Sequence, residues 1–276
     1  MTAKVLIFDS GVGGFSVFQH IRQALPGLES CYLMDNQLFP YGIQADDVLI
    51  ERIVSLCDKA CQLHNIDMVV IACNTASTLA LPALRQQLNI PVIGVVPAIK
   101  TAASLSQTKH IALLATPATI NRSYIDQLCA DYAQDCQVTR IGSSELVKLA
   151  EDYWFHGALE LSALQDILSS DLTVNSDTTS SSVSANNIDQ MVLGCTHFPL
   201  IRDHISKLYP HVNLVDSGEA IARRVCFILQ DLGFDLQQLK SESNKHNLLT
   251  TAAISNKNEF LSACRRIAPY QSFNII

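Results

Sequence analysis

The chain has 276 residues and a formal charge of −7, and 48% of its residues are hydrophobic while 16% are charged. This size and composition predict a globular protein whose core needs no disulfide or metal, and the acidic balance without a long basic run argues against a nucleic-acid partner. No apolar run is long enough to span a bilayer and the N-terminus lacks the pattern of an export signal, so we expect a soluble, cytoplasmic protein without a membrane partner.

Short apolar runs alternate with longer segments of helical period, which predicts an α/β fold with mainly parallel sheets. The expected strands, in chain order, are 5–9, 30–35, 68–72, 92–96, 110–116, 137–142, 191–194, 212–216 and 248–254. The expected helices are 14–25, 45–64, 76–88, 121–133, 144–151, 158–169, 199–208, 218–232 and 257–266. Several of these helices open after Ser, Thr, Asp or Asn, the residues that favour helix starts.

The two halves of the chain carry a weak internal repeat. The segments DMVVIACNT (67–75) and DQMVLGCTH (189–197) each place an aspartate six residues before a cysteine, with an apolar strand between them. The earlier strands KVLIFDSG and KHIALLATP also correspond. The second half is longer because it contains a segment rich in Ser and Thr, 169–187, which is typical of a surface insertion.

Parallel α/β sheets bind ligands beyond the carboxyl ends of their strands, so the residues that follow each apolar run are the informative ones. Free cysteine is often simply buried, and the odd number of scattered cysteines, nine in all, predicts reduced thiols. Cys73 and Cys195 stand out from the other seven because their settings match. Four strand ends are rich in hydrogen-bonding groups: Asp9-Ser10, Cys73-Asn74-Thr75, Thr116 with Thr119, and Cys195-Thr196-His197.

Other kinds of site fit these residues less well. The segment DSGVGGF (9–15) could cradle a phosphate, but it lacks the lysine of a Walker loop and the full dinucleotide spacing, and a tight glycine turn is the alternative. A zinc site would need closely spaced ligands that the sequence lacks. A cysteine hydrolase built from Cys195 and His197 would leave Cys73 without a role. A binding protein whose two domains close on an acidic ligand stays open as an alternative.

Two cysteines at equivalent points of two related halves would face one another across a cleft. That arrangement suits reversible proton transfer at a carbon atom, with one thiolate removing a proton and the opposing thiol delivering one. No lysine lies in a recognisable pyridoxal-phosphate setting, so we expect no cofactor. Hydroxyl and amide groups would neutralise the substrate carboxylate; the candidates are Asn74, Thr75, Thr116, Thr119 and Thr196. Asp9 and His197 are candidates to tune the two thiols.

A set of motifs carries a family resemblance over nearly the whole chain: FDSGVGGFSV (8–17), PYG (40–42), ACNTAS (72–77), GVVPAIK (94–100), ATPATI (115–120), Glu151 after ELVKLA, LGCTHFPLI (193–201) and VDSGEAIA (215–222). In this order they resemble the glutamate racemases of the cofactor-independent aspartate/glutamate racemase superfamily. The combination is specific, although each motif alone is weak. A racemase for aspartate or another small acid is the nearest alternative, and PYG together with the full set favours glutamate.

The resemblance implies interconversion of L- and D-glutamate, which supplies D-glutamate for bacterial peptidoglycan, cell-wall biogenesis and cell shape. It assigns Cys73 to the D-enantiomer and Cys195 to the L-enantiomer. Asp9 would assist Cys73, and His197 would assist Cys195 with Glu151 nearby. The glutamate pocket would be lined by Asp9, Ser10, Tyr41, Gly42, Asn74, Thr75, Thr116, Thr119, Thr196 and His197.

The resemblance also implies two similar α/β domains related by pseudo-two-fold symmetry, with the active site in the cleft between them. The first domain is expected to hold residues 1–95 and 210–276, and the second residues 96–209. Homodimers are usual in the family. Some relatives have an N-terminal extension and need a cell-wall precursor as activator, whereas here the first strand starts at residue 4.

Overall fold

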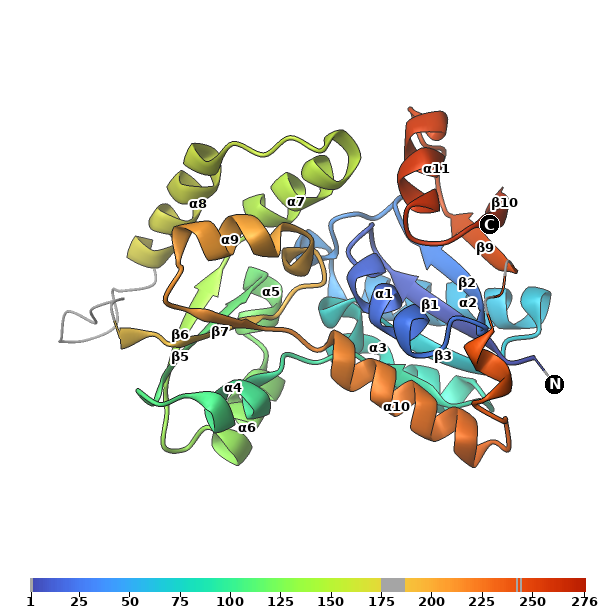
Figure 1. Ribbon diagram of the computed structural model, residues 1–276, viewed down its shortest axis with the longest axis horizontal. Coiled ribbons are helices and arrows are strands. Elements are labelled where there is room, and N and C mark those ends of the chain that lie inside the picture. The colour runs from blue at the N-terminus through green and yellow to red at the C-terminus, as the bar shows by residue number, and fades with distance from the viewer. Residues whose placement is uncertain (1, 175–186, 242, 244) are drawn as a thin grey trace. The chain divides into compact units, whose positions relative to one another are not determined.

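The computed structural model describes residues 2–174, 187–241, 243 and 245–276 (Figure 1). The chain divides into two compact units, residues 1–95 with 218–276 and residues 96–217. Each unit has its own parallel sheet, as the alternation of apolar runs and helical segments predicts. Within the described ranges no helix is both long and apolar enough to cross a membrane.

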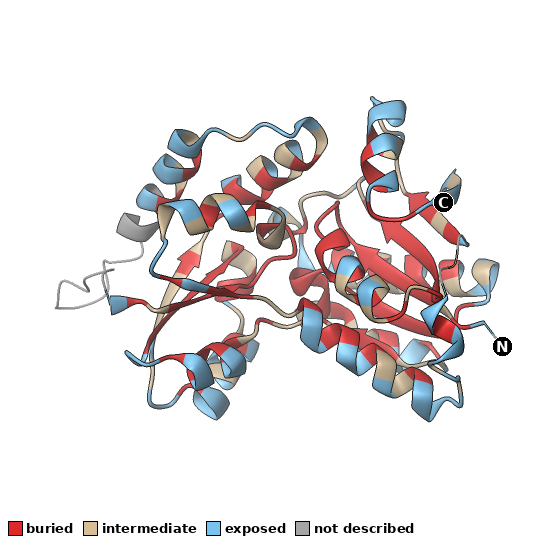
Figure 2. Ribbon diagram, viewed as in Figure 1, coloured by how far each residue is buried: buried red, intermediate tan, exposed pale blue. Residues whose placement is uncertain are grey.

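The first unit contains a six-stranded sheet in the order β10-β9-β2-β1-β3-β4, and every neighbouring pair is parallel. Its central strands are buried on both faces, which explains why they are almost continuously apolar in sequence (Figure 2). The strands are β1 (Lys4–Asp9), β2 (Glu29–Met34), β3 (Met68–Ile71), β4 (Val92–Gly94), β9 (His246–Thr250) and β10 (Tyr270–Ile275).

The helices of the first unit pack in pairs. Helix α1 packs against α10, and α2 packs against α3. Alternate residues of β1, Leu6 and Phe8, belong to the core cluster that includes buried residues of α2 and α3. The helices are α1 (Phe15–Ala24), α2 (Asp46–His64), α3 (Asn74–Gln87), α10 (Gly218–Asp231) and α11 (Lys257–Arg265), with short 3-10 turns η1 (Tyr41–Ile43) and η4 (Gln238–Lys240).

The second unit contains a four-stranded parallel sheet in the order β6-β5-β7-β8. Helix α8 contacts both α7 and α9 on one side of this sheet, while α4 and α6 contact each other on the opposite side (Figure 1). The strands are β5 (His110–Ala115), β6 (Gln137–Gly142), β7 (Gln190–Leu193) and β8 (Asn213–Val215). The helices are α4 (Ile99–Leu105), α5 (Pro117–Ile120), α6 (Ser123–Tyr132), α7 (Glu145–His156), α8 (Leu161–Val174) and α9 (Arg202–Leu208), with the 3-10 turn η3 (Phe198–Ile201).

The two sheets repeat the same strand order. The order β2-β1-β3-β4 in the first unit corresponds to β6-β5-β7-β8 in the second, and β9 and β10 extend the first sheet beyond β2. The repeated aspartates have equivalent roles. Asp67 accepts a 2.8 Å hydrogen bond from the Lys4 amide, and Asp189 accepts one of 2.6 Å from the Gln107 amide. Asp67 therefore ties its cysteine strand to the start of β1, and Asp189 ties its cysteine strand to the segment just before β5.

The expected elements appear with several additions and shifts. Helix α4 was not expected because it is only seven residues long, and β10 was not expected because its YQSFNI sequence, on an edge strand, is not an apolar run. The second unit extends to residue 217 rather than 209, because β8 pairs with β7. Helix α8 occupies the beginning of the expected 169–187 insertion, and positions 175–186 of that insertion lie outside the described residues.

Candidate active site

The predicted site residues of the first unit lie at the carboxyl edge of its sheet. Phe8 of β1 is paired with Ile71 of β3, so the residues just after these two strands are neighbours. Ser10 Oγ lies 3.9 Å from Cys73 Sγ, and both side chains are almost completely buried. Parallel pairing therefore places a hydroxyl beside a thiol that is 63 residues away in the sequence.

Cys73 occupies the N-cap position of α3, which is 14 residues long and begins at Asn74 rather than at the expected residue 76. The partial positive charge at a helix N-terminus favours a thiolate. Asn74 and Thr75 are both buried. Within the described part of the chain, the buried Oδ1 of Asn74 has no hydrogen-bond partner. An unpaired buried amide oxygen beside a thiol is suited to accept a hydrogen bond from a bound ligand.

The glycine-rich segment after β1 forms a tight turn that holds Asp9. The Gly11 amide donates a 2.8 Å hydrogen bond to Asp9 Oδ1, and the Tyr32 hydroxyl donates one of 2.8 Å to the Gly11 carbonyl. A Cβ atom at Gly14 would lie 2.7 Å from the Tyr32 hydroxyl and 2.8 Å from Asp9 Cβ. Because of this crowding, close packing requires a glycine at position 14. This agrees with the tight glycine turn that was the alternative to a phosphate loop.

Tyr41 and Gly42 form the 3-10 turn η1 after Pro40. Tyr41 is buried in the same core cluster as Cys73, and its ring centroid lies 6.3 Å from that of Phe8. Its hydroxyl donates a 2.7 Å hydrogen bond to Asp35 Oδ2. Burial raises the pKa of Tyr41, and the neighbouring Asp35 carboxylate raises it further, so this hydroxyl stays protonated and directed at Asp35.

The predicted site residues of the second unit include a connected group of three side chains. His197 Nδ1 lies 3.8 Å from Cys195 Sγ, and His197 Nε2 lies 2.6 Å from Glu151 Oε2. Cys195 follows β7, whereas Glu151 comes from α7, which contacts η3 beside His197. The histidine is 2% exposed and the glutamate side chain 14%, so this ion pair is shielded from solvent.

The environment of His197 favours the imidazolium form. Burial alone would lower its pKa, but hydrogen bonds and charges from Cys195 and Glu151 outweigh burial and raise the pKa well above its ordinary value. A protonated imidazole beside Sγ stabilises a thiolate. Cys73 therefore lies at a helix start, whereas Cys195 lies beside the imidazolium of His197.

The remaining predicted residues lie at the strand ends of the second unit. Thr116 caps α5, and its Oγ1 accepts a 3.2 Å hydrogen bond from the Thr119 amide and lies 3.0 Å from Thr119 Oγ1. Thr116, Thr119 and Thr196 are all buried. Leu114 of β5 pairs with Leu193 of β7, so these threonines follow neighbouring strands as Ser10 and Cys73 do.

Sequence reasoning missed a buried cluster around Asp35, which is linked to Arg52 and Thr251 as well as to Tyr41. Asp35 and Thr251 each follow an observed strand of the first sheet, β2 and β9, at the edge where ligands bind, whereas the expected strands 30–35 and 248–254 included both residues. Only four strand ends were singled out, and these two were not among them.

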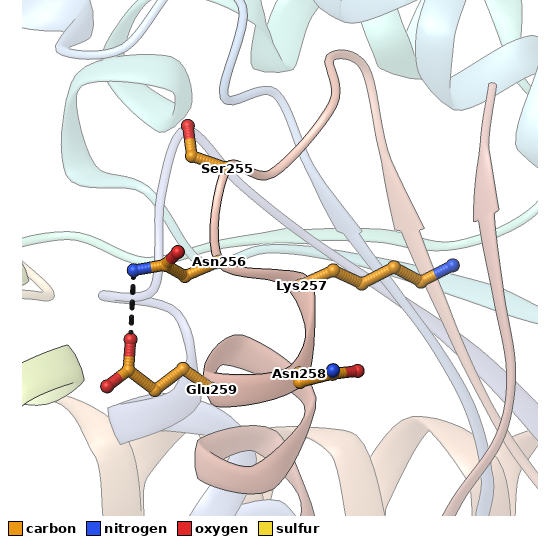
Figure 3. Close-up of a pocket in the computed structure, with 5 residues that line it drawn as sticks. All are labelled: Ser255, Asn256, Lys257, Asn258 and Glu259. Atoms are coloured by element: carbon orange, nitrogen blue, oxygen red, sulfur yellow. Dashed lines mark hydrogen bonds between the residues drawn. The ribbon is translucent and has the colours of Figure 1, made fainter.

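A separate pocket of about 600 Å³ lies at the start of α11, where Asn256 Nδ2 donates a 3.0 Å hydrogen bond to Glu259 Oε2 (Figure 3). None of the predicted site residues lines it. Within the described ranges, no group of three or more His, Cys, Asp or Glu side chains is arranged to hold a metal ion. The pocket lining is Ser255, Asn256, Lys257, Asn258 and Glu259.

Comparison with known proteins places the chain among amino-acid racemases. The Asp/Glu/Hydantoin racemase family model matches residues 12–225. A glutamate racemase of Shewanella frigidimarina is 47% identical over 242 residues, which are 87% of this chain and 89% of that protein. A glutamate racemase of Pasteurella multocida is 44% identical over 246 residues, which are 89% of this chain and 86% of that protein.

A solved structure shares the fold. The crystal structure of Escherichia coli glutamate racemase, in complex with L-glutamate and the activator UDP-MurNAc-ala, is 38% identical to this chain. It aligns with a TM-score of 0.86 and covers 100% of this chain and 98% of its own. The match to the family model and the identity to these relatives over most of the chain show that the chain belongs to the Asp/Glu/Hydantoin racemase family.

Proposed function

We propose that this protein is a glutamate racemase that interconverts L- and D-glutamate by a two-base mechanism without a cofactor. Two thiols at equivalent strand ends, each with its own means of stabilising a thiolate, are the observation that carries the proposal. Cys73 lies at the start of α3, and Cys195 lies beside the imidazole of His197. Relatives named glutamate racemase, 44% to 47% identical over most of the chain, support the choice of substrate.

The proposed reaction exchanges one proton at the α-carbon. With D-glutamate bound, the Cys73 thiolate takes the α-proton, and the C–H electron pair stays on the substrate as a carbanion delocalised into the α-carboxylate. The Cys195 thiol then delivers its proton to the opposite face, which forms L-glutamate and leaves Cys195 as the thiolate. The reverse reaction begins from this state, so no oxidant, reductant or co-reactant is needed.

The energetic problem is the weak acidity of the α-proton, and the proposed solution is to neutralise the carboxylates in a dry site. Hydroxyl groups supply uncharged hydrogen-bond donors for the carboxylates. The unpaired Asn74 amide oxygen is an acceptor and is suited to the substrate ammonium. Asp9 is held beside Ser10 by the glycine turn and is proposed to assist Cys73. The proposed substrate-binding side chains are Ser10, Asn74, Thr75, Thr116, Thr119, Thr196 and His197, with the Tyr41–Gly42 turn.

His197 has a defined part in this scheme. Its imidazolium, held by Glu151, favours the Cys195 thiolate that must form when L-glutamate is the substrate. His197 is therefore proposed to tune Cys195 rather than to act as the base that attacks carbon. Glu151 is proposed to act through His197, because its carboxylate accepts the hydrogen bond from Nε2.

The proposal extends to the cellular role. D-glutamate would be supplied for peptidoglycan and hence for cell-wall biogenesis and cell shape, in the cytoplasm, where the nine free thiols suit a reducing compartment. We also propose a homodimer, for which light scattering coupled to gel filtration is the test. Activation by a cell-wall precursor is tested by adding UDP-MurNAc-Ala, the activator bound to the Escherichia coli relative.

The deciding experiment is incubation with L-glutamate in deuterated water, with α-deuterium followed by NMR and racemisation by optical rotation. We expect both to proceed, with no added cofactor, and to stop in the Cys73→Ala and Cys195→Ala variants. Exchange with aspartate but not glutamate would favour the aspartate alternative. Saturable glutamate binding with no exchange at all would identify a binding protein and refute a racemase.

A further inference from the structure

The buried carboxylate of Asp35 holds together three segments of the first unit. Arg52 of α2 donates two hydrogen bonds to it, each 2.8 Å, and Tyr41 of η1 donates a third of 2.7 Å. Thr251, which follows β9, donates a fourth of 2.5 Å. Two carboxylate oxygens have about four acceptor positions, so these donors fill all of them.

The register of the sheet explains why these segments meet. Met34 of β2 is paired with Thr250 of β9, and the residues that come next are Asp35 and Thr251. Both therefore lie at the carboxyl edge of the sheet, which is the edge that carries Cys73. The cluster thus belongs to the functional edge of the sheet and not to its far end.

The second unit uses the equivalent position for a similar purpose. The Asp35 amide donates to the Asp9 carbonyl at 2.9 Å, and the Ser143 amide donates to the Ala115 carbonyl at 2.9 Å. Ser143 Oγ then accepts a 3.1 Å hydrogen bond from the Leu146 amide in the first turn of α7, the helix that carries Glu151. In both units the residue after the second strand fixes the next segment, and that segment carries a predicted site residue.

We infer that Asp35 is a positioning residue for glutamate binding, which acts by anchoring the Tyr41–Gly42 turn through the Tyr41 hydroxyl. The inference rests on the proposed function. Because the Tyr41 hydroxyl donates its hydrogen bond to Asp35, the Tyr41 ring stays in the core cluster that contains Cys73. Ile43, at the other end of the turn, is 67% exposed. Arg52 compensates the charge of Asp35, so the cluster does not repel a dicarboxylate substrate.

Asp35→Asn tests this inference against a matched control, Glu29→Gln. Glu29 is also buried and paired with two lysines, but it begins β2 at the opposite end of the same strand. We expect Asp35→Asn to raise KM for both glutamate enantiomers about tenfold, or about 1.4 kcal/mol, with kcat changed less than about threefold. Glu29→Gln is expected to leave both constants within about twofold while lowering Tm.

Hydrogen–deuterium exchange supplies a readout independent of activity. Amides of residues 38–44 are expected to exchange about tenfold faster in Asp35→Asn and at the wild-type rate in Glu29→Gln. Tyr41→Phe removes the same hydrogen bond from the other partner, so the double variant with Asp35→Asn should have a KM no higher than Asp35→Asn alone. Tyr41→Phe also serves as the test if Asp35→Asn does not fold.

The outcomes separate this inference from the proposed function. Unchanged exchange in residues 38–44 would refute the anchoring, and faster exchange with unchanged KM would refute the role in glutamate binding. An additive double variant would refute action through Tyr41. If the wild-type protein does not racemise glutamate, the proposed function fails, while the exchange measurement still decides whether Asp35 anchors the turn.

Discussion

Replacing Glu151 by Gln is the sharpest test of how Cys195 is tuned. The substitution keeps the size of the side chain and an oxygen that can accept the hydrogen bond from His197 Nε2, but removes the negative charge 2.6 Å away. The imidazolium of His197 then loses the buried partner that raises its pKa. We expect its pKa to fall, so that the imidazole becomes neutral at a lower pH.

The size of the effect follows from the geometry of the pair. The Gln amide keeps the hydrogen bond, so what is lost is the opposite charge; a nearby opposite charge shifts a pKa by about 1–3 units, and the lower part of that range corresponds to about 1.5–3 kcal/mol. The small exposed fractions of His197 and Glu151 argue against discounting this for solvent. One pKa unit corresponds to about 1.36 kcal/mol, so the alkaline limb of kcat should shift to lower pH by about 1–2 units. A histidine with a raised pKa stabilises the fold below its unfolded pKa of about 6.5, and this contribution disappears as pH rises through the folded pKa.

The assay is racemisation in both directions across pH, with Glu145→Gln as control. Glu145 is exposed at the start of the same helix, and its substitution should leave the profile unchanged. Enantiomers have equal free energies, so kcat/KM must fall equally in both directions. A difference between the two directions should appear in the primary isotope effect, which should be larger with α-deuterated L-glutamate than with the D-enantiomer because Cys195 is proposed to act on the L-enantiomer.

Two results would contradict this reasoning. An alkaline limb that stays within about 0.3 units of the wild-type position, where a shift of about 1–2 units is expected, would show that Glu151 does not tune His197. A larger isotope effect with D-glutamate would assign the thiols the other way round.

Three further predictions use other parts of the molecule. Cys73→Ala and Cys195→Ala should each lower kcat by about 10²–10⁴-fold or more without loss of the circular dichroism spectrum. Cys226→Ala on α10 is the control and should keep activity. Racemisation retained by either site variant would refute the two-base mechanism. Gly14→Ala should destabilise the protein by about 1–3 kcal/mol in urea unfolding because the added Cβ would lie only 2.7 Å from the Tyr32 hydroxyl and 2.8 Å from Asp9 Cβ. An unchanged midpoint would contradict that packing. Burial lowers the pKa of His246, so the unfolded state takes up the proton first and the free energy of unfolding should fall as pH drops below about 6.5. His246→Asn should reduce this fall, measured as the difference in free energy of unfolding between urea titrations at pH 7.5 and 5.5. An unchanged difference would exclude His246 as its source.

The sequence alone predicted most of the candidate site residues because strand ends carry a local signal. Each apolar run that ends in a polar cluster marks the place where a parallel strand reaches the ligand-binding edge, and the matched settings of Cys73 and Cys195 made the repeat visible. All nine expected strands appear, most of them because strands buried on both faces are continuous apolar runs; β6, a partly buried edge strand with the sequence QVTRIG, is an exception to that reason. The edge strand β10 gave no such run and was missed.

Only the tertiary structure decided the contacts between residues that are distant in sequence. The hydrogen bond from His197 to Glu151 spans 46 residues, and that from Thr251 to Asp35 spans 216. Neither has a local pattern, because each depends on which strands are neighbours in the sheet and on where a helix packs. Residue order determined which groups stand at the strand ends, and sheet order determined which of those groups touch, since only parallel pairing brings separate strand ends to one edge.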